Sequence, residues 1–242
     1  MLTVDINCDV GEGMDNEALL MPYISSCNIA CGAHAGDVAT IDRVIGIARK
    51  HQVRVGAHPS FPDRKNFGRE VMDISSDALA ASLIQQIRLM QARLGNERLH
   101  HVKAHGALYN LSAVDRDVAS VVVQAVRETA ADSLLYVPDN SVIAALAIRH
   151  QLNVRYEAFA DRNYLDDLRL VPRTQKNALI TNRAAVISHL MRMVVGRQVK
   201  TVSAQLIPIR AETYCVHGDH DAAVEIVRHI HQEMTRRGIA IA

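Results

Sequence analysis

Apolar positions follow two different spacings along this chain. Short apolar runs, some with alternating polar positions, are separated by longer segments whose apolar residues recur every three to four positions. The short runs predict β-strands, because such segments bury one or both faces of a sheet. Seven strands are predicted, at Leu2–Cys8, Cys27–Cys31, Val53–Ala57, His100–Ala104, Leu134–Val137, Val154–Ala158 and Thr213–Val216.

The longer segments predict helices. In Val38–Gln52 one face carries the apolar side chains, and Asp77–Leu94 follows two serines suited to capping and stops at Gly95. The remaining helices are predicted at Asp115–Thr129, Ser141–Gln151, Arg183–Val195 and Asp219–Arg237. Strands that alternate with helices indicate parallel β/α units. Because no Pro/Gly/Ser-rich linker interrupts them, we expect residues 1–242 to form a single α/β barrel domain.

Four of the predicted strands lead into a histidine beside a small residue or proline. These are His34, His58, His105 and His217. Because parallel strands of a barrel end on one rim, the four imidazoles are expected to lie near each other. Imidazoles beside carboxylates suit proton transfer near neutral pH, and they also suit metal binding. The four lie in separate loops, so no local spacing supports a metal, which stays an alternative.

Side-chain parity places polar residues inside the barrel. Asp5, Asn7 and Asp9 share one face of the first strand, because successive side chains of a strand point to opposite sides. The same rule groups His101 with Lys103 and His105, Arg155 with Glu157, and Cys215 with His217. We expect a polar barrel interior in which these groups offset each other's charge. An amphipathic strand on the surface is the alternative.

Loops that follow the strands supply further candidates. The small-residue loop between Asn28 and Asp37 either presents backbone N–H groups to an anion or is a tight turn with Asp37 as helix cap. Glu12, between two glycines, is either a rim residue or a solvated turn carboxylate. Neither a P-loop nor a Rossmann glycine motif is present. The polar loop Ser60–Met72 is a candidate lid.

Composition narrows the class of protein. The chain has 242 residues, 49% hydrophobic and 22% charged, with a net charge of +1. That balance gives no reason to expect nucleic acid or an anionic membrane as a partner. Its apolar stretches are too short to cross a bilayer, and its N-terminus does not resemble a signal peptide, so we expect a cytoplasmic protein. The four cysteines form no CxxC pair and are expected to be reduced.

Taken together, the motifs resemble the A subunit of bacterial ATP-dependent 5-oxoprolinase, the lactam-utilisation protein family. The stretches that carry the resemblance are DINCDVGEG (5–13), NIACGAHAGD (28–37), VGAHPSFPDRKNFGRE (55–70), HVKAHGALYN (101–110), EAFADRNYLDDLRLVPR (157–173) and CVHGD (215–219). The resemblance implies a distorted seven-stranded β/α barrel of the glycoside hydrolase and deacetylase type. It also implies conversion of 5-oxoproline, ATP and water to L-glutamate, ADP and phosphate, with two partner subunits, B and C.

Site residues are carried over from these motifs onto this chain. The catalytic candidates are Asp5, Asp9, Lys103, His105 and His217. The substrate-binding candidates are Asn7, Glu12, Asn28, His34, His58, Tyr109, Glu157, Asp161, Arg162 and Arg173. ATP is expected as co-substrate, with Mg²⁺ as its possible companion and no metal required by the protein itself. A homo-oligomer is also expected.

Each group of candidates has an expected role. Lys103 would neutralise an oxyanion or phosphate, and Asp5 or Asp9 with His105 or His217 would move protons. Two arginines, Arg162 and Arg173, would hold the substrate carboxylate or phosphates. Two alternatives remain: a metal-dependent carbohydrate deacetylase on the same barrel, and a non-catalytic subunit that binds the lactam for its partners.

Overall fold

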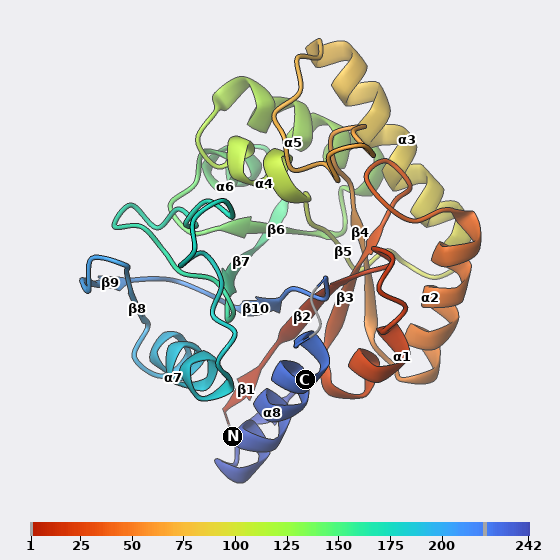
Figure 1. The fold of residues 1–242 in the computed structure, drawn as a ribbon. Coiled ribbons are helices and arrows are strands. Elements are labelled where there is room, and N and C mark those ends of the chain that lie inside the picture. The colour runs from red at the N-terminus through yellow and green to blue at the C-terminus, as the bar shows by residue number, and fades with distance from the viewer. Residues whose placement is uncertain (1, 220–221) are drawn as a thin grey trace.

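A computed structural model describes residues 2–219 and 222–242 of the chain. Seven parallel strands close into a barrel in the order β10-β2-β3-β4-β5-β6-β7, which confirms the predicted fold class (Figure 1). The barrel strands are β2 (Ile6–Val10), β3 (Ser26–Ala30), β4 (Arg54–His58), β5 (His101–Val102), β6 (Leu134–Pro138), β7 (Asn153–Phe159) and β10 (Thr213–Val216). All seven predicted strands therefore contribute to one sheet.

Helices surround the barrel and connect its strands (Figure 1). They are α1 (Glu17–Leu20), the 3₁₀ turn η1 (Met21–Tyr23), α2 (Val38–Lys50), α3 (Ser76–Leu94), α4 (Gly106–Ser112), α5 (Arg116–Ala130), α6 (Val142–Arg149), α7 (Arg183–Val194) and α8 (Ala223–Arg236). Several begin at a side-chain cap: Asp37 accepts a hydrogen bond from the Thr40 amide at 2.8 Å, and Ser75 caps α3 in the same way. Asp37 is therefore a helix cap, as one of the two interpretations of the Asn28–Asp37 loop predicted.

Some local predictions were incomplete. The first predicted strand is two strands, because β1 (Thr3–Val4) pairs outside the barrel with β11 (Ala240–Ile241) while β2 enters it. The short helix α4 and the hairpin of β8 (Gln198–Lys200) and β9 (Leu206–Pro208) were not predicted. The last helix begins at Ala223 rather than Asp219, and His220 and Asp221 of that predicted helix lie outside the described residues.

Successive side chains of each strand point alternately to the helices and into the barrel, and this separates an apolar core from a polar one. Ile6, Cys8, Cys27 and Ile29 are fully buried apolar positions that face the helices. Polar side chains occupy the alternate positions and meet inside the barrel, where Asn7 donates a hydrogen bond to Glu157 at 2.9 Å. The interior is thus polar, as the strand pattern predicted.

Two further features concern the cysteines and the apolar character of the helices. The four cysteines, Cys8, Cys27, Cys31 and Cys215, are buried and form no disulfide. Across the described part of the chain, no helix has both the length and the apolar character needed to cross a membrane.

Candidate active site

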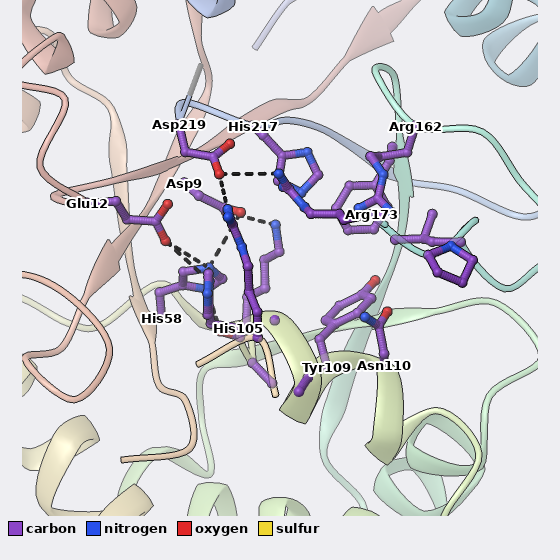
Figure 2. Close-up of a pocket in the computed structure, with 18 of the residues that line it drawn as sticks. Asp9, Glu12, His58, His105, Tyr109, Asn110, Arg162, Arg173, His217 and Asp219 are labelled. Atoms are coloured by element: carbon purple, nitrogen blue, oxygen red, sulfur yellow. Dashed lines mark hydrogen bonds and ion pairs between the residues drawn. The ribbon is translucent and has the colours of Figure 1, made fainter. Parts of the chain in front are cut away.

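A cavity of about 470 Å³ opens at the carboxyl ends of the barrel strands. Figure 2 shows Glu12, His58 and His105 on one side of it and Tyr109, Asn110, Arg162 and Arg173 on the other. Between these two sides lie His217 and Asp219, while Asp9 and Lys103 also line the cavity. Polar side chains from distant parts of the chain therefore converge at the rim that the sequence predicted.

The floor of the cavity is a buried ion-pair network. The Lys103 ammonium is 2.8 Å from Asp9 Oδ1 and 3.1 Å from Glu157 Oε1, and the residue is 1% exposed. Burial opposes the ionised form of Asp9, but the His58 and Lys103 cations outweigh it and hold the pKa of Asp9 well below its usual range. Burial raises the pKa of Glu157. Asp9 is therefore the ionised carboxylate of the floor.

Amide side chains support this floor from within the barrel. Asn28 Nδ2 donates to Asp9 Oδ1 and to Asn7 Oδ1, each at 2.7 Å. His101 Nε2 lies 2.6 Å from Asn28 Oδ1 and fixes the orientation of that amide. The ring of His101 fits only because Gly56 has no side chain, since a Cβ there would lie 2.1 Å from Nε2. These residues position Asp9 without lining the cavity.

Histidines form one wall of the cavity. His58 Nδ1 donates to the Lys103 carbonyl at 2.8 Å, and His105 Nε2 donates to the Phe67 carbonyl at 2.9 Å. The remaining ring nitrogens, His58 Nε2 and His105 Nδ1, face each other at 3.0 Å. Glu12 Oε1 lies 3.2 Å from His105 Nδ1. The end of β4 and two loops thus direct His58 Nε2, His105 Nδ1 and Glu12 Oε1 at one point.

His34 supports this wall from behind. Its ring stacks on that of His105, with centroids 3.8 Å apart and an angle of 5° between the planes. Its Nε2 lies 3.1 Å from Glu12 Oε1, and its Nδ1 lies 2.9 Å from the Ser60 hydroxyl. Burial lowers the pKa of His34 to about 4, so the ring is neutral at neutral pH. His34 therefore positions Glu12 and His105.

A second histidine unit lies beside the floor. His217 Nδ1 is 3.1 Å from both carboxylate oxygens of Asp161, and the His217 backbone N–H donates to Asp161 Oδ2 at 2.9 Å. The ring also stacks on Phe159 with centroids 5.2 Å apart. Asp161 therefore holds Nδ1 as the protonated nitrogen and leaves Nε2 as the nitrogen able to accept a proton.

The opposite wall is rich in arginine. Asp219 Oδ2 pairs with Arg69 and, at 3.3 Å, with Arg173 Nη1. Arg162 instead binds backbone, because its Nε and Nη2 donate to the carbonyls of Ala178 and Val171 at 3.2 and 2.6 Å. Burial and the neighbouring Arg173 lower the pKa of Arg162 to about 10, so it stays charged at neutral pH. Arg162 lines the cavity with Arg69 and Arg173, but its hydrogen bonds mainly fix the loop after β7.

The structure gathers most predicted site residues around one cavity. Those that line it are Asp9, Glu12, His58, Lys103, His105, Tyr109, Arg162, Arg173 and His217. Those that touch the lining residues from behind are Asn7, Asn28, His34, Glu157 and Asp161.

Asp5 is the exception, and its predicted catalytic role is not compatible with its position. It lies at the amino ends of the strands, where it pairs with Arg54 at 2.7 Å and Arg155 at 3.2 Å and accepts a hydrogen bond from Thr213 at 2.6 Å. Parity correctly predicted the inward face, but parity says nothing about depth along the strand. Asp5 and Asp9 therefore occupy opposite ends of the barrel.

The candidate lid, Ser60–Met72, is attached to the rim. The Phe67 carbonyl binds His105, and the Gly68 carbonyl accepts the Ala107 amide at 2.9 Å. Gly106 permits this approach, because it has a φ of +57° and a Cβ there would lie 2.5 Å from the Gly68 oxygen. Whether the loop opens stays a prediction.

Several lining residues were not singled out from the sequence. Arg69, Asn110 and Phe159 line the cavity beside the predicted residues. Phe159 lies on the same strand face as Arg155 and Glu157, so its inward direction could have been predicted from the sequence. Arg69 lies in an irregular loop, where no periodicity indicates the direction of a side chain.

Comparisons with known proteins find relatives that match this chain over its whole length. The model of the LamB/YcsF family matches residues 4–242. Relatives named as the A subunit of 5-oxoprolinase include one from Histophilus somni, 38% identical over all of this chain and 98% of the relative, and one from Bacillus cytotoxicus, 36% identical with the same coverage.

Solved structures show the same fold. The lactam utilization protein from Thermus thermophilus superposes with a TM-score of 0.92 at 33% identity, covering 99% of both chains. A family 4 carbohydrate esterase from Streptomyces lividans covers 99% of this chain and 91% of its own, with a TM-score of 0.54 and 8% identity. The esterase shares the barrel fold alone.

Proposed function

Because the chain belongs to the LamB/YcsF family, we propose that it is the A subunit of a 5-oxoprolinase and cleaves the lactam amide of 5-oxoproline to give L-glutamate. The proposal includes hydrolysis of ATP to ADP and phosphate by an assembly with subunits B and C. It is supported by relatives named as the A subunit of 5-oxoprolinase, which match the whole of this chain.

The observation that carries the proposal is the arrangement of Asp9, the histidine wall and the arginine wall around one cavity. A lactam that bears a carboxylate needs a cation at one end and proton-transferring groups at its amide. Arg173, whose side chain is 29% exposed, and Arg69 offer guanidinium groups suited to the carboxylate. His217 Nε2 is the acceptor for a proton, while Asp9 stays ionised beside Lys103, which offsets negative charge that develops near Asp9.

ATP has a thermodynamic role in this proposal. The five-membered lactam is a stable amide, so its opening is coupled to a favourable reaction. The chain has no P-loop motif, so we assign ATP activation to the assembly with subunits B and C, with Mg²⁺ accompanying the nucleotide. The cytoplasmic location and the homo-oligomeric state stay predictions of the sequence.

Reconstitution tests the proposal. The assembly with subunits B and C should hydrolyse ATP in response to 5-oxoproline, and an Arg173→Ala chain should require much more 5-oxoproline to do so. An assembly in which omitting this chain leaves glutamate formation unchanged would refute the proposal.

Two alternative functions can be distinguished by the ligands that the chain binds or cleaves. A non-catalytic lactam-binding subunit would bind 5-oxoproline tightly in calorimetry, and Asp9→Asn would then leave turnover by the assembly intact. A carbohydrate deacetylase would release acetate from N-acetylated sugars and ignore 5-oxoproline. We favour the lactam because the opposite wall of the cavity is cationic, which a neutral sugar does not require.

A further inference from the structure

Three potential metal-binding atoms converge on the histidine side of the cavity. His58 Nε2 and His105 Nδ1 are 3.0 Å apart, and Glu12 Oε1 lies 3.2 Å from His105 Nδ1 and 3.8 Å from His58 Nε2. Ligands at 2.0–2.1 Å from a tetrahedral Zn²⁺ are separated by about 3.3–3.4 Å. The spacing of the three atoms is therefore that of three corners of a metal tetrahedron.

Hydrogen bonds to backbone occupy the outer nitrogen of each ring. His58 Nδ1 donates to the Lys103 carbonyl, and His105 Nε2 donates to the Phe67 carbonyl, so the two nitrogens that face each other are the ones that can bind an ion. A metal ion there would displace the proton that His58 Nε2 otherwise shares with Asp9 Oδ2, 3.5 Å away. A proton on His105 Nδ1 faces both Glu12 Oε1 at 3.2 Å and His58 Nε2 at 3.0 Å, so the two acceptors would have to share one N–H. One cation in contact with all three atoms satisfies them together.

The surroundings are those of a supported metal site. Both histidines donate their outer N–H to a carbonyl, which is the usual way in which a protein orients an imidazole ligand. His34 Nε2 lies 3.1 Å from the Glu12 oxygen and holds that carboxylate in place. The side chains of Glu12 and His58 are 4% and 1% exposed. The three ligands also line the cavity, so a fourth position would face it.

We propose that Glu12, His58 and His105 bind one divalent transition-metal ion of the Zn²⁺ class. Two imidazoles and one carboxylate with an open position suit an ion that binds water or polarises a carbonyl oxygen. This site goes beyond the proposed function, because it does not depend on which amide is cleaved. It also departs from the sequence-based expectation that the protein itself needs no metal.

Metal binding by the full-length chain tests the proposal without any measurement of turnover. The chain is stripped with a chelator, and Zn²⁺ is titrated against a chromophoric competitor, with the visible spectrum of Co²⁺ as a second probe. We expect one ion per chain. Glu12→Gln, which has nearly the same shape, and His105→Gln should each weaken binding by about 100-fold.

The matched control is His217→Gln, which alters the same cavity outside the three ligands and should leave Zn²⁺ affinity unchanged. Thermal unfolding of the stripped variants shows that each one folds. Failure of the wild-type chain to bind Zn²⁺ or Co²⁺ would overturn the metal site, as would equal affinity in the wild type, Glu12→Gln and His105→Gln. Loss of 5-oxoproline turnover affects only the proposed function, because the metal titration does not measure it.

Discussion

At the scale of single residues, position along a strand decides what a carboxylate does. Asp5 and Asp9 share a face of the first predicted strand, yet Asp5 pairs with two arginines at the amino ends while Asp9 faces the cavity. Burial raises the pKa of Asp5, whereas two cations lower that of Asp9. The same residue type pairs with arginines at one position and lines the cavity four residues later.

Asparagine substitutions separate these two roles. Asp9→Asn removes the ionised carboxylate that pairs with Lys103 and should lower the turnover of the reconstituted assembly by about 100-fold or more. Asp5→Asn should keep turnover but lower the free energy of unfolding by about 1–3 kcal/mol, because Arg54 and Arg155 lose their anionic partner. Steady-state rates and denaturant unfolding check both results. Near-normal turnover by Asp9→Asn would remove it from the mechanism.

Arg173 is predicted to act in binding rather than in the chemical step. Arg173→Lys keeps the charge but loses the planar fork that holds a carboxylate through two hydrogen bonds. We expect the KM for 5-oxoproline to rise about 10-fold with little change in kcat. An unchanged KM with a reduced kcat would contradict this role.

At the scale of elements, β4 shows how a strand supports the site. Gly56 leaves room for the His101 ring, His101 holds Asn28, and Asn28 holds Asp9. The strand then ends at His58 on the histidine wall. A change within the strand is therefore transmitted to the floor of the cavity through two hydrogen bonds.

A pair of glycine substitutions tests this connection. Gly56→Ala places a methyl group 2.1 Å from His101 Nε2 and should cost about 1–3 kcal/mol of stability together with a loss of turnover. Gly46→Ala in α2 meets nothing within 4 Å and should stabilise by about 0.5–1 kcal/mol with normal turnover. Equal stability of the two variants in urea unfolding would refute the connection.

The strands were largely predictable because their apolar runs and parity are local. Parity grouped His101, Lys103 and His105 and placed the polar residues inward, as the structure shows. The depth of Asp5 was not predictable, since it depends on the register between strands. The closeness of His58 and His105 followed from their places at strand ends on one rim, but the contact of Glu12 with both rings did not, because it depends on the path of the loop after β2.

At the scale of the whole molecule, folding must bury titratable groups, and this makes stability depend on pH. His189 in α7 is buried beside Tyr164, and its Nε2 has no hydrogen-bond partner among the described residues. Burial lowers the pKa of His189 from 6.5 to about 4. The unfolded chain therefore binds this proton more readily than the folded one, and stability falls as the pH drops from about 6.5 towards 4.

Replacing His189 should reduce the pH dependence of the free energy of unfolding. Between pH 7 and pH 5 the wild type should lose about 2 kcal/mol of stability through His189, a loss absent from His189→Leu and His189→Gln. Chemical denaturation at both pH values measures it. If all three proteins lose the same stability, the buried ring does not titrate as described.

We propose that the cavity at the carboxyl ends of the barrel cleaves the lactam within the assembly. This is tested most directly by the formation of glutamate from 5-oxoproline and ATP by subunits B and C combined with the wild-type chain, Asp9→Asn or Asp5→Asn. We expect glutamate with the wild type and Asp5→Asn and about 100-fold less with Asp9→Asn. Equal glutamate formation with Asp9→Asn and the wild type would contradict it.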